Sequence, residues 1–172
     1  MKRFFICICL VLCWSTVFAY DLTLHDTQAS IYFSPQGGAQ QAIVDAIGKA
    51  RESVYVQAYS FTSAPIAKAL VDAKARGVKV EAILDKSQRK ATYTGATFLK
   101  NAGIPVYIDD KHAIAHNKVM ILDGQTVITG SFNFTKAAEE RNAENLLILR
   151  DKGLALLYTE NWQKHLEHSE GY

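Results

Sequence analysis

The stretch that decides the fold spans residues 116–133 and reads HNKVMILDGQTVITGSFN. Two short apolar runs inside it, residues 119–122 and 126–129, predict buried strands. The Asp-Gly pair at 123–124 favours a tight turn between them, so the two strands are expected to form a hairpin. A hairpin brings the start of its first strand beside the end of its second, and both of these ends carry polar side chains.

The polar side chains at that end of the hairpin suit a bound phosphate. His116 and Lys118 enter the first strand, while Ser131 and Asn133 follow the second. An imidazole able to act as a nucleophile, a fixed cation and two neutral hydrogen-bond donors would then converge on one point. The hairpin therefore predicts a phosphate-binding site.

The spacing of these residues resembles a known signature. The pattern H-x-K-x4-D, followed by six residues and then G-S-x-N, is similar to that of the phospholipase D superfamily, above all its small bacterial endonucleases with a single motif. Residues 59–62, 69–80 and 142–145 also resemble that branch, so the similarity covers nearly all of the chain after the first twenty residues. The resemblance implies phosphodiester chemistry on an α-β-α sandwich.

Phosphodiester cleavage requires charge neutralisation, a nucleophile and a proton donor, and the motif offers residues for these roles. His116 is expected to attack phosphorus and form a phosphohistidine. Lys118 is expected to supply positive charge, and Asn133 and Ser131 to donate to the non-bridging oxygens.

Two acidic residues receive different roles. As in the family that the chain resembles, Glu144 is expected to hold an imidazole N–H and fix its tautomer. The alternative is that Glu144 only pairs with Arg141 or a nearby lysine. Asp123 lies at the turn, far from His116 along the strand, and is expected to be structural, tying the hairpin to neighbouring backbone.

A metal site is a weaker interpretation of the histidines. His112 and His116 are four residues apart, with Asp109 and Asp110 upstream, which would suit zinc if the segment were helical. The preceding residues read as extended, so no metal and no other cofactor are expected. The remaining histidines are expected at the surface: His25, His165 and His168.

The first 19 residues have the pattern of a secretory signal peptide. Lys2 and Arg3 precede an apolar stretch that ends in Val17-Phe18-Ala19, a small-residue cleavage pattern. An uncleaved anchor and a lipoprotein attached at Cys13 remain alternatives. We therefore expect a bacterial protein exported to the periplasm or beyond, without stable membrane association after cleavage.

The rest of the chain, residues 20–172, is expected to form one domain. All three cysteines lie in the first 19 residues, so neither disulfides nor thiol chemistry are expected afterwards. Removing Lys2 and Arg3 leaves 17 basic and 17 acidic residues, which excludes a uniform polycation. Affinity for nucleic acid would have to come from a local patch.

Strand and helix patterns alternate along this domain, which predicts an α/β fold with a mixed, largely parallel sheet and helices on both faces. Expected strands cover residues 31–34, 54–59, 78–84, 104–108 and 146–149, in addition to the hairpin. Expected helices cover residues 39–51, 97–102 and 154–166, with another from about residue 63 to residue 77.

A basic segment between Asp85 and Gly95 is a candidate nucleic-acid contact. It contains Lys86, Arg89, Lys90 and Tyr93, of which the cations would follow a phosphate backbone and Tyr93 would stack on an unpaired base. An ordinary solvated loop fits the same composition.

The leading functional hypothesis is an exported, metal-independent endonuclease acting on DNA, or on RNA, with little sequence preference. The chain contains a single H-x-K, yet the chemistry needs one neutral and one protonated imidazole. A homodimer would supply the second, and the resemblance implies the same arrangement. The alternatives are a phospholipase D-type lipid phosphodiesterase and a non-catalytic phosphate-binding module.

Overall fold

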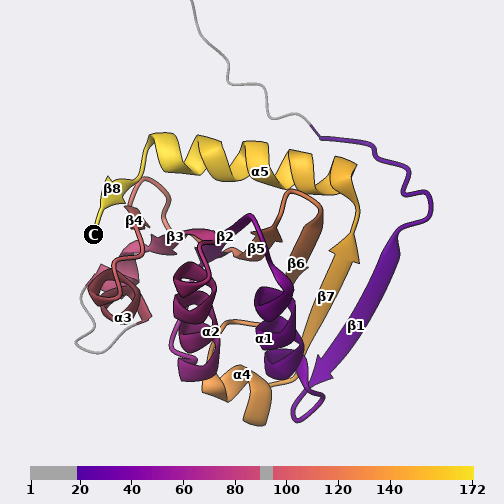
Figure 1. Ribbon diagram of the computed structural model, residues 1–172, viewed down its shortest axis with the longest axis horizontal. Coiled ribbons are helices and arrows are strands. Elements are labelled where there is room, and N and C mark those ends of the chain that lie inside the picture. Colours follow the sequence, from indigo (N-terminus) through magenta and orange to yellow (C-terminus); the bar gives the residue numbers. More distant parts are fainter. Residues whose placement is uncertain (1–18, 90–94) are drawn as a thin grey trace, which may run out of the picture.

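The computed structural model describes residues 19–89 and 95–172, and its centre is an eight-stranded sheet with helices on both faces (Figure 1). The predicted signal peptide, except Ala19, lies outside the described residues, as do Lys90 and Tyr93. In chain order the elements are β1 (Gln28–Ser34), α1 (Ala39–Lys49), β2 (Ser53–Ala58), α2 (Ala64–Ala75), β3 (Lys79–Asp85), η1 (Lys86–Arg89), α3 (Gly95–Asn101), β4 (Val106–Asp109), β5 (Lys118–Leu122), β6 (Thr126–Gly130), α4 (Lys136–Glu140), β7 (Glu144–Arg150), α5 (Lys152–Glu167) and β8 (Glu170–Gly171).

The sheet is mixed, as expected, but less of it is parallel than predicted. Its strand order is β1-β7-β6-β5-β2-β3-β4-β8, and only the β2–β3 and β3–β4 pairs are parallel. The other pairs are antiparallel. A parallel pair needs a crossover of a dozen or more residues, which α2 and α3 provide. The segments at 110–117 and 123–125 are too short for a crossover, so the chain reverses direction there.

One face of the sheet is covered by α1 and α2. Apolar residues at helical spacing form the buried side of α1, with Ile43 and Ile47 fully enclosed. The first turn of α2 contains Pro65, and the Ser63 side chain caps it by accepting a hydrogen bond from the backbone N–H of Ile66. Both helices therefore begin and pack as the sequence pattern indicates.

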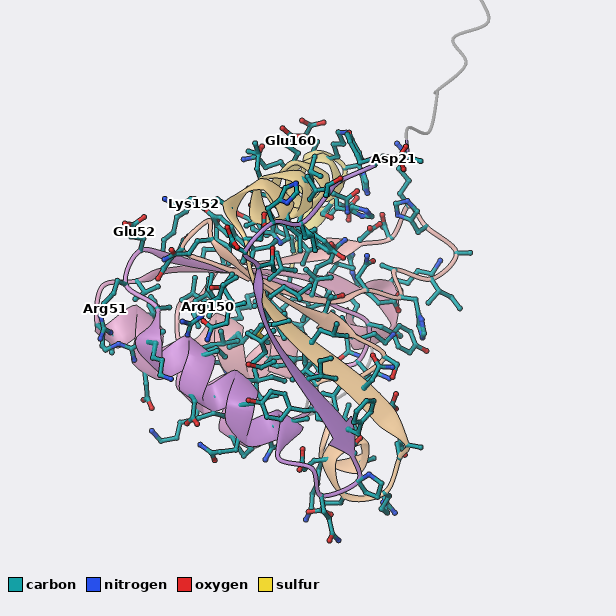
Figure 2. The ribbon with its side chains drawn as sticks, turned by 90° about the vertical axis from the view of Figure 1, so that its right-hand side faces the viewer. Asp21, Arg51, Glu52, Arg150, Lys152 and Glu160 are labelled. Carbon is teal, nitrogen blue, oxygen red and sulfur yellow. The ribbon has the colours of Figure 1, made fainter. Side chains whose placement is uncertain are left out.

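The opposite face is covered by α5, and Figure 2 shows α5 and α1 on opposite sides of the strands. Asp151 caps α5 by accepting a hydrogen bond of 2.8 Å from the Leu154 N–H. Trp162 is buried, stacks on Tyr55 at 4.7 Å between ring centroids, and donates its indole N–H to the Val56 carbonyl. The apolar side of α5 therefore belongs to the core.

Several elements are longer than expected, and three were not predicted. β1 starts three residues earlier than its apolar run, and β7 starts two residues earlier, at Glu144. The elements η1, α4 and β8 have four, five and two residues, too few to produce a periodic pattern. The pairing of β1 with β7 over seven positions explains the longer strands, because each edge supplies hydrogen bonds to the other.

No helix within residues 19–89 or 95–172 combines the length and the apolar character that crossing a bilayer requires.

Candidate active site

The candidate site lies at the edge of the sheet where β2, β3, β4 and β6 end and where β5 and β7 begin. The register at this edge places Lys118 beside Ala58, and Gly130 beside Leu146. At the outer strand, Ser34 lies beside Glu144. The strand directions therefore gather side chains from distant parts of the chain at one edge, as the hairpin predicted for His116, Lys118, Ser131 and Asn133.

Lys118 is a buried cation held beside the motif histidine. It is the first residue of β5, its exposed fraction is 7%, and its Nζ donates a hydrogen bond of 2.7 Å to the His116 carbonyl. The same Nζ lies 5.2 Å from the centroid of the Tyr59 ring, a cation–π distance. Burial lowers the pKa of the Lys118 ammonium, while the nearby Glu144 carboxylate acts to raise it.

The His116 imidazole is exposed and lies against Tyr59. The two ring centroids are 4.6 Å apart, with the rings tilted by 53°. Among the described residues, no hydrogen bond holds the imidazole nitrogens, so both are available to a ligand. Sequence reasoning gave Tyr59 no role. Its position after β2, at the same sheet edge as the motif, was the signal that could have identified it.

Ser131 and Asn133 follow β6 and present polar groups at the site. Ser131 Oγ accepts hydrogen bonds from the backbone N–H and the side-chain amide of Asn145, at 3.1 and 3.3 Å. Its own proton is left for another acceptor. Asn133 Oδ1 is buried and has no hydrogen-bond partner within the described residues. The group of Asn133 that can donate to a phosphate oxygen is its side-chain NH₂.

Close packing fixes the segment that carries these two side chains. Gly130 has φ 145°, and a Cβ at this position would lie 2.3 Å from the Asn145 carbonyl oxygen, so no larger residue fits. Phe132 and Phe134 are fully buried on either side of Asn133. Phe134 also contacts the Phe61 ring edge-on, at 6.3 Å between centroids. The chain after β6 is therefore anchored in the core.

Glu144 lies at the start of β7, close enough to Lys118 to influence its charge. Its carboxylate accepts a hydrogen bond of 3.1 Å from the Asn142 side chain. Within the described residues it bonds neither the His116 imidazole nor Arg141. The contact predicted for Glu144, with an imidazole N–H, is therefore absent from the single chain.

Asp123 lies at the opposite end of β5, roughly 16 Å from Lys118 at the usual rise per strand residue. Its carboxylate accepts hydrogen bonds from the backbone N–H groups of three consecutive residues, Arg51, Glu52 and Ser53, at 2.8–3.2 Å. Figure 2 shows Arg51 and Glu52 at the end of the molecule where α1 ends. This motif residue ties the hairpin to the loop before β2, away from the chemistry.

A cavity of about 510 Å³ adjoins the site through Tyr59 and extends to the basic segment. Two of the four predicted nucleic-acid contacts, Lys86 and Arg89, line it. Lys86 Nζ donates to the His112 carbonyl at 2.9 Å, and Arg89 pairs with Glu170 at 3.1 Å. The other lining residues are Asp85, Ser87, Asp110, Ala113 and Ile114.

Two of the other histidines, His165 and His168, do not lie where the sequence reasoning placed them. His116 is not part of a cluster with His112. Instead, His112, His165 and His168 surround Asp109, which is fully buried at the end of β4. The expectation of surface positions for His165 and His168 is therefore wrong, while His25 is exposed. Burial acts to raise the pKa of Asp109, but the close approach of the three histidines outweighs it and holds that pKa well below its usual range.

The motif side of the site has the parts needed to act on a phosphate. His116 offers an unbound nitrogen, Lys118 a fixed positive charge, and Ser131 and Asn133 neutral polar groups. Among the described residues, this edge holds no carboxylate cluster of the kind that binds Mg²⁺ for phosphoryl transfer.

Comparison with known families gives a match over most of the chain. The model described as "Cardiolipin synthase, PLD-like domain" matches residues 43–166. Among curated proteins, phospholipase D of Rickettsia conorii is 48% identical over 139 residues, which cover 81% of this chain and 70% of that protein.

Solved structures give the same answer. Nuc from Salmonella typhimurium, described as a phospholipase D family member, superposes with a TM-score of 0.81 at 38% identity, covering 86% of this chain and 99% of that one. NucT from Helicobacter pylori superposes with a TM-score of 0.79 at 30% identity, covering 86% and 100%. Both alignments span nearly the whole of the solved chain.

Proposed function

This chain belongs to the phospholipase D superfamily and is a phosphodiesterase, and on that premise we propose that it is an exported nuclease. It hydrolyses phosphodiester bonds of DNA with little sequence preference and without a metal ion in the reaction. The observation that carries this proposal is the buried Lys118 ammonium fixed 2.7 Å from the His116 carbonyl, beside an exposed imidazole.

The surroundings of these two residues suit an extended polyanion. Tyr59 connects them to the cavity that Lys86 and Arg89 line, so phosphates on either side of the cleaved bond would meet further cations. Tyr59 also offers a ring face for a nucleobase. These contacts would be made with the phosphate backbone and with the face of a base, neither of which identifies the base, so little sequence preference is expected.

The proposed reaction has two displacement steps at phosphorus. The neutral His116 imidazole attacks, a P–N bond forms, and the P–O bond to the leaving alcohol breaks. A second, protonated imidazole gives its proton to that leaving oxygen. Water then attacks the phosphohistidine, the second imidazole takes the proton, and His116 is released. Lys118, Ser131 and Asn133 stabilise the charge on the non-bridging oxygens.

The second imidazole comes from a second copy of the chain. The sequence has one H-x-K, and the three remaining histidines near this edge surround Asp109 instead. A two-fold dimer would bring His116 of both protomers to one phosphate. In such a dimer the Glu144 carboxylate of one protomer could accept a hydrogen bond from an imidazole N–H of the other.

An exposed apolar strip supports such an interface. Ile31 and Phe33 on the edge strand β1 are 57% and 68% exposed. Gln28, Ser30 and Tyr32 line a cavity against α1, so Ile31 and Phe33 point to the other face of the sheet. Phe33 is registered with Asn145, whose side chain bonds Ser131, which places the strip next to the site. We include this strip, with the motif edge, in the proposed dimer interface.

A lipid phosphodiesterase is the second candidate. The Rickettsia conorii relative is named phospholipase D, and Ile114 at the cavity rim is 57% exposed. One exposed isoleucine is a small apolar contact for a bilayer surface, whereas the cavity also contains two cations and two carboxylates. The balance favours the nucleic-acid substrate.

Export follows from the N-terminal pattern, and cleavage after Ala19 would leave Tyr20 as the first residue. Intact-mass measurement of the protein recovered from a bacterial periplasm or medium tests this. A mass that includes Met1 contradicts it.

Substrate assays with matched variants test the activity. The mature protein is incubated with supercoiled plasmid and, separately, with vesicles of phosphatidylcholine and cardiolipin. We expect plasmid cleavage by the wild type and by His25→Ala, which changes an exposed histidine outside the site, and none by His116→Ala. Hydrolysis of the vesicles with an intact plasmid would show that the lipid alternative is correct.

A further inference from the structure

Four side chains able to bind a metal meet where β4, β8 and the end of α5 come together. Asp109 ends β4, His112 follows it in the loop, His165 lies in the last turn of α5 and His168 caps that helix. One ligand atom from each lies within 4.8 Å of the others. Asp109 Oδ2 is 2.7 Å from His165 Nδ1, 3.0 Å from His112 Nδ1 and 3.4 Å from His168 Nε2.

The fold brings these residues together from separate parts of the chain. His165 and His168 are three residues apart at the end of a helix, so they lie on the same side of it. After α5 the chain returns beside β4, where β8 pairs antiparallel with it through Ile108 and Glu170. The imidazole centroids are 4.9–5.3 Å apart, so the three rings enclose one point near the carboxylate.

Hydrogen bonds alone do not satisfy this group. Asp109 Oδ2 lies within 3.4 Å of a nitrogen of each imidazole, and His112 Nδ1 is also 3.0 Å from Asp109 Oδ1. His168 Nε2 is buried and has no hydrogen-bond partner within the described residues. A buried nitrogen in this state costs free energy.

We propose that Asp109, His112, His165 and His168 bind one divalent transition-metal ion, with zinc as the fitting element. Zinc binds nitrogen and carboxylate oxygen at about 2.0–2.1 Å, so tetrahedral ligand atoms lie roughly 3.3 Å apart. The three distances to Asp109 Oδ2 bracket that separation. A metal would take His168 Nε2 as a ligand and remove its unpaired state.

The ligand chemistry selects the class of metal. Three imidazole nitrogens and one carboxylate oxygen suit zinc, whereas calcium and magnesium prefer sites made of oxygen. The protein supplies all four tetrahedral positions, which leaves none for water or substrate, so the site is structural. It is therefore separate from the phosphodiesterase chemistry assigned to His116.

The metal would link the end of α5 to the loop that leads to the active site. The loop already has two anchors: Lys86 Nζ binds the His112 carbonyl, and Asp85 accepts the Ala115 N–H at 2.8 Å. His116 follows directly after Ala115. Binding of His112 to a metal held also by α5 would fix a third point of the same loop, while β8 alone offers two paired residues.

Metal content and stability test the proposal without any substrate. The mature protein is purified without a histidine tag and analysed by elemental mass spectrometry, where about one zinc per chain is expected. Removing the metal with a chelator should lower the midpoint of thermal unfolding by about 5–10 °C, and added zinc should restore it. Cobalt in place of zinc should give the visible absorption of a tetrahedral site.

Matched histidine variants localise the site. His165→Ala and His168→Gln should lose the zinc, whereas His25→Ala and His116→Ala should keep it. If both cluster variants fail to fold, the chelator and zinc titration of the wild type decides. Wild-type protein without bound metal and without a thermal response to zinc would overturn the proposal, as would equal loss of zinc in His25→Ala.

Discussion

The two histidine regions of this protein differ in how completely the chain satisfies them. The His116 imidazole is exposed and packs against the Tyr59 ring, with neither ring nitrogen hydrogen-bonded among the described residues. His112, His165 and His168 crowd around one buried carboxylate at the other side of the same sheet edge. The first region presents its imidazole to solvent, and the second gathers three imidazoles around a buried carboxylate inside the fold.

This difference distinguishes a residue suited to catalysis from residues suited to a structural role. A nucleophile must be reachable, so its nitrogen cannot already be bound within the chain. A structural centre gains from enclosure, because burial strengthens its internal interactions and excludes competing water. The eight-residue loop at 110–117 carries one histidine for each purpose, His112 near its start and His116 near its end.

The largest expected effect separates the two regions by activity. His116→Ala should lower the rate of phosphodiester hydrolysis by about 10³-fold or more, because it removes the nucleophile, while changing unfolding free energy by less than about 0.5 kcal/mol. Initial rates on plasmid and thermal unfolding measure both. His165→Ala should show the reverse pattern, a lower midpoint with the rate of the folded protein retained within a few-fold. If His165→Ala lost as much activity as His116→Ala, the two regions would have to be parts of one catalytic site, and the prediction would be wrong.

A smaller loss of stability is expected from changing Asp85, which holds the loop at 110–117 between the two histidine regions. Asp85 is 2% exposed, and its carboxylate accepts the N–H groups of Ser87 and Ala115. Burial acts to raise the pKa of Asp85, but these hydrogen bonds and the Lys86 charge outweigh it, so the pKa is lowered. Asp85→Asn should reduce the unfolding free energy by about 1–2 kcal/mol at pH 7.

The pH dependence of that loss follows from the sign of the shift. A lowered pKa in the folded state contributes stability above the unfolded value, about 3.9, and this stability is lost as the pH falls toward the folded value. Denaturant titrations from pH 7 to pH 3 should show the wild type approaching Asp85→Asn below about pH 5. A difference that stays constant over this range would show that the charge of Asp85 does not contribute.

The smallest expected effect is that of a chelator on the reaction rate. With Lys118 as the built-in cation, initial rates on DNA should not change during a brief incubation in excess EDTA at 25 °C. Thermal unfolding of the same sample should respond, because the histidine cluster loses its metal. A loss of activity that Mg²⁺ restores would contradict the metal-free reaction. Restoration by zinc alone would place the effect in the loop between the two regions.

The sequence predicted the motif region because its information is local. The hairpin, the Asp-Gly turn and the polar ends all lie within eighteen residues, so their proximity follows from strand geometry. Asp123 was assigned to structure by the same reasoning, and its three backbone hydrogen bonds agree with that role.

The cluster could not be predicted because it depends on tertiary contacts. Asp109 and His165 are 56 residues apart, and only the packing of α5 and the two-residue strand β8 bring them together. His165 and His168 have helical spacing that is equally common on solvated surfaces. The direction of β5 is a similar case, because it depends on a short loop rather than on any residue pattern. The imidazole contact predicted for Glu144 is not formed within the described residues, where its carboxylate accepts from the Asn142 side chain.

The exposed state of His116 has a direct consequence, which subunit mixing tests best. We propose that one His116 is an incomplete catalyst and that a second protomer completes it. Wild-type protein is refolded together with increasing proportions of His116→Ala, and nuclease activity is measured against the wild-type fraction. Random assembly into dimers predicts activity that falls as the square of that fraction, because only wild-type homodimers hold two histidines at the site. Activity that falls in simple proportion to the fraction would show that each protomer acts alone and would contradict the account.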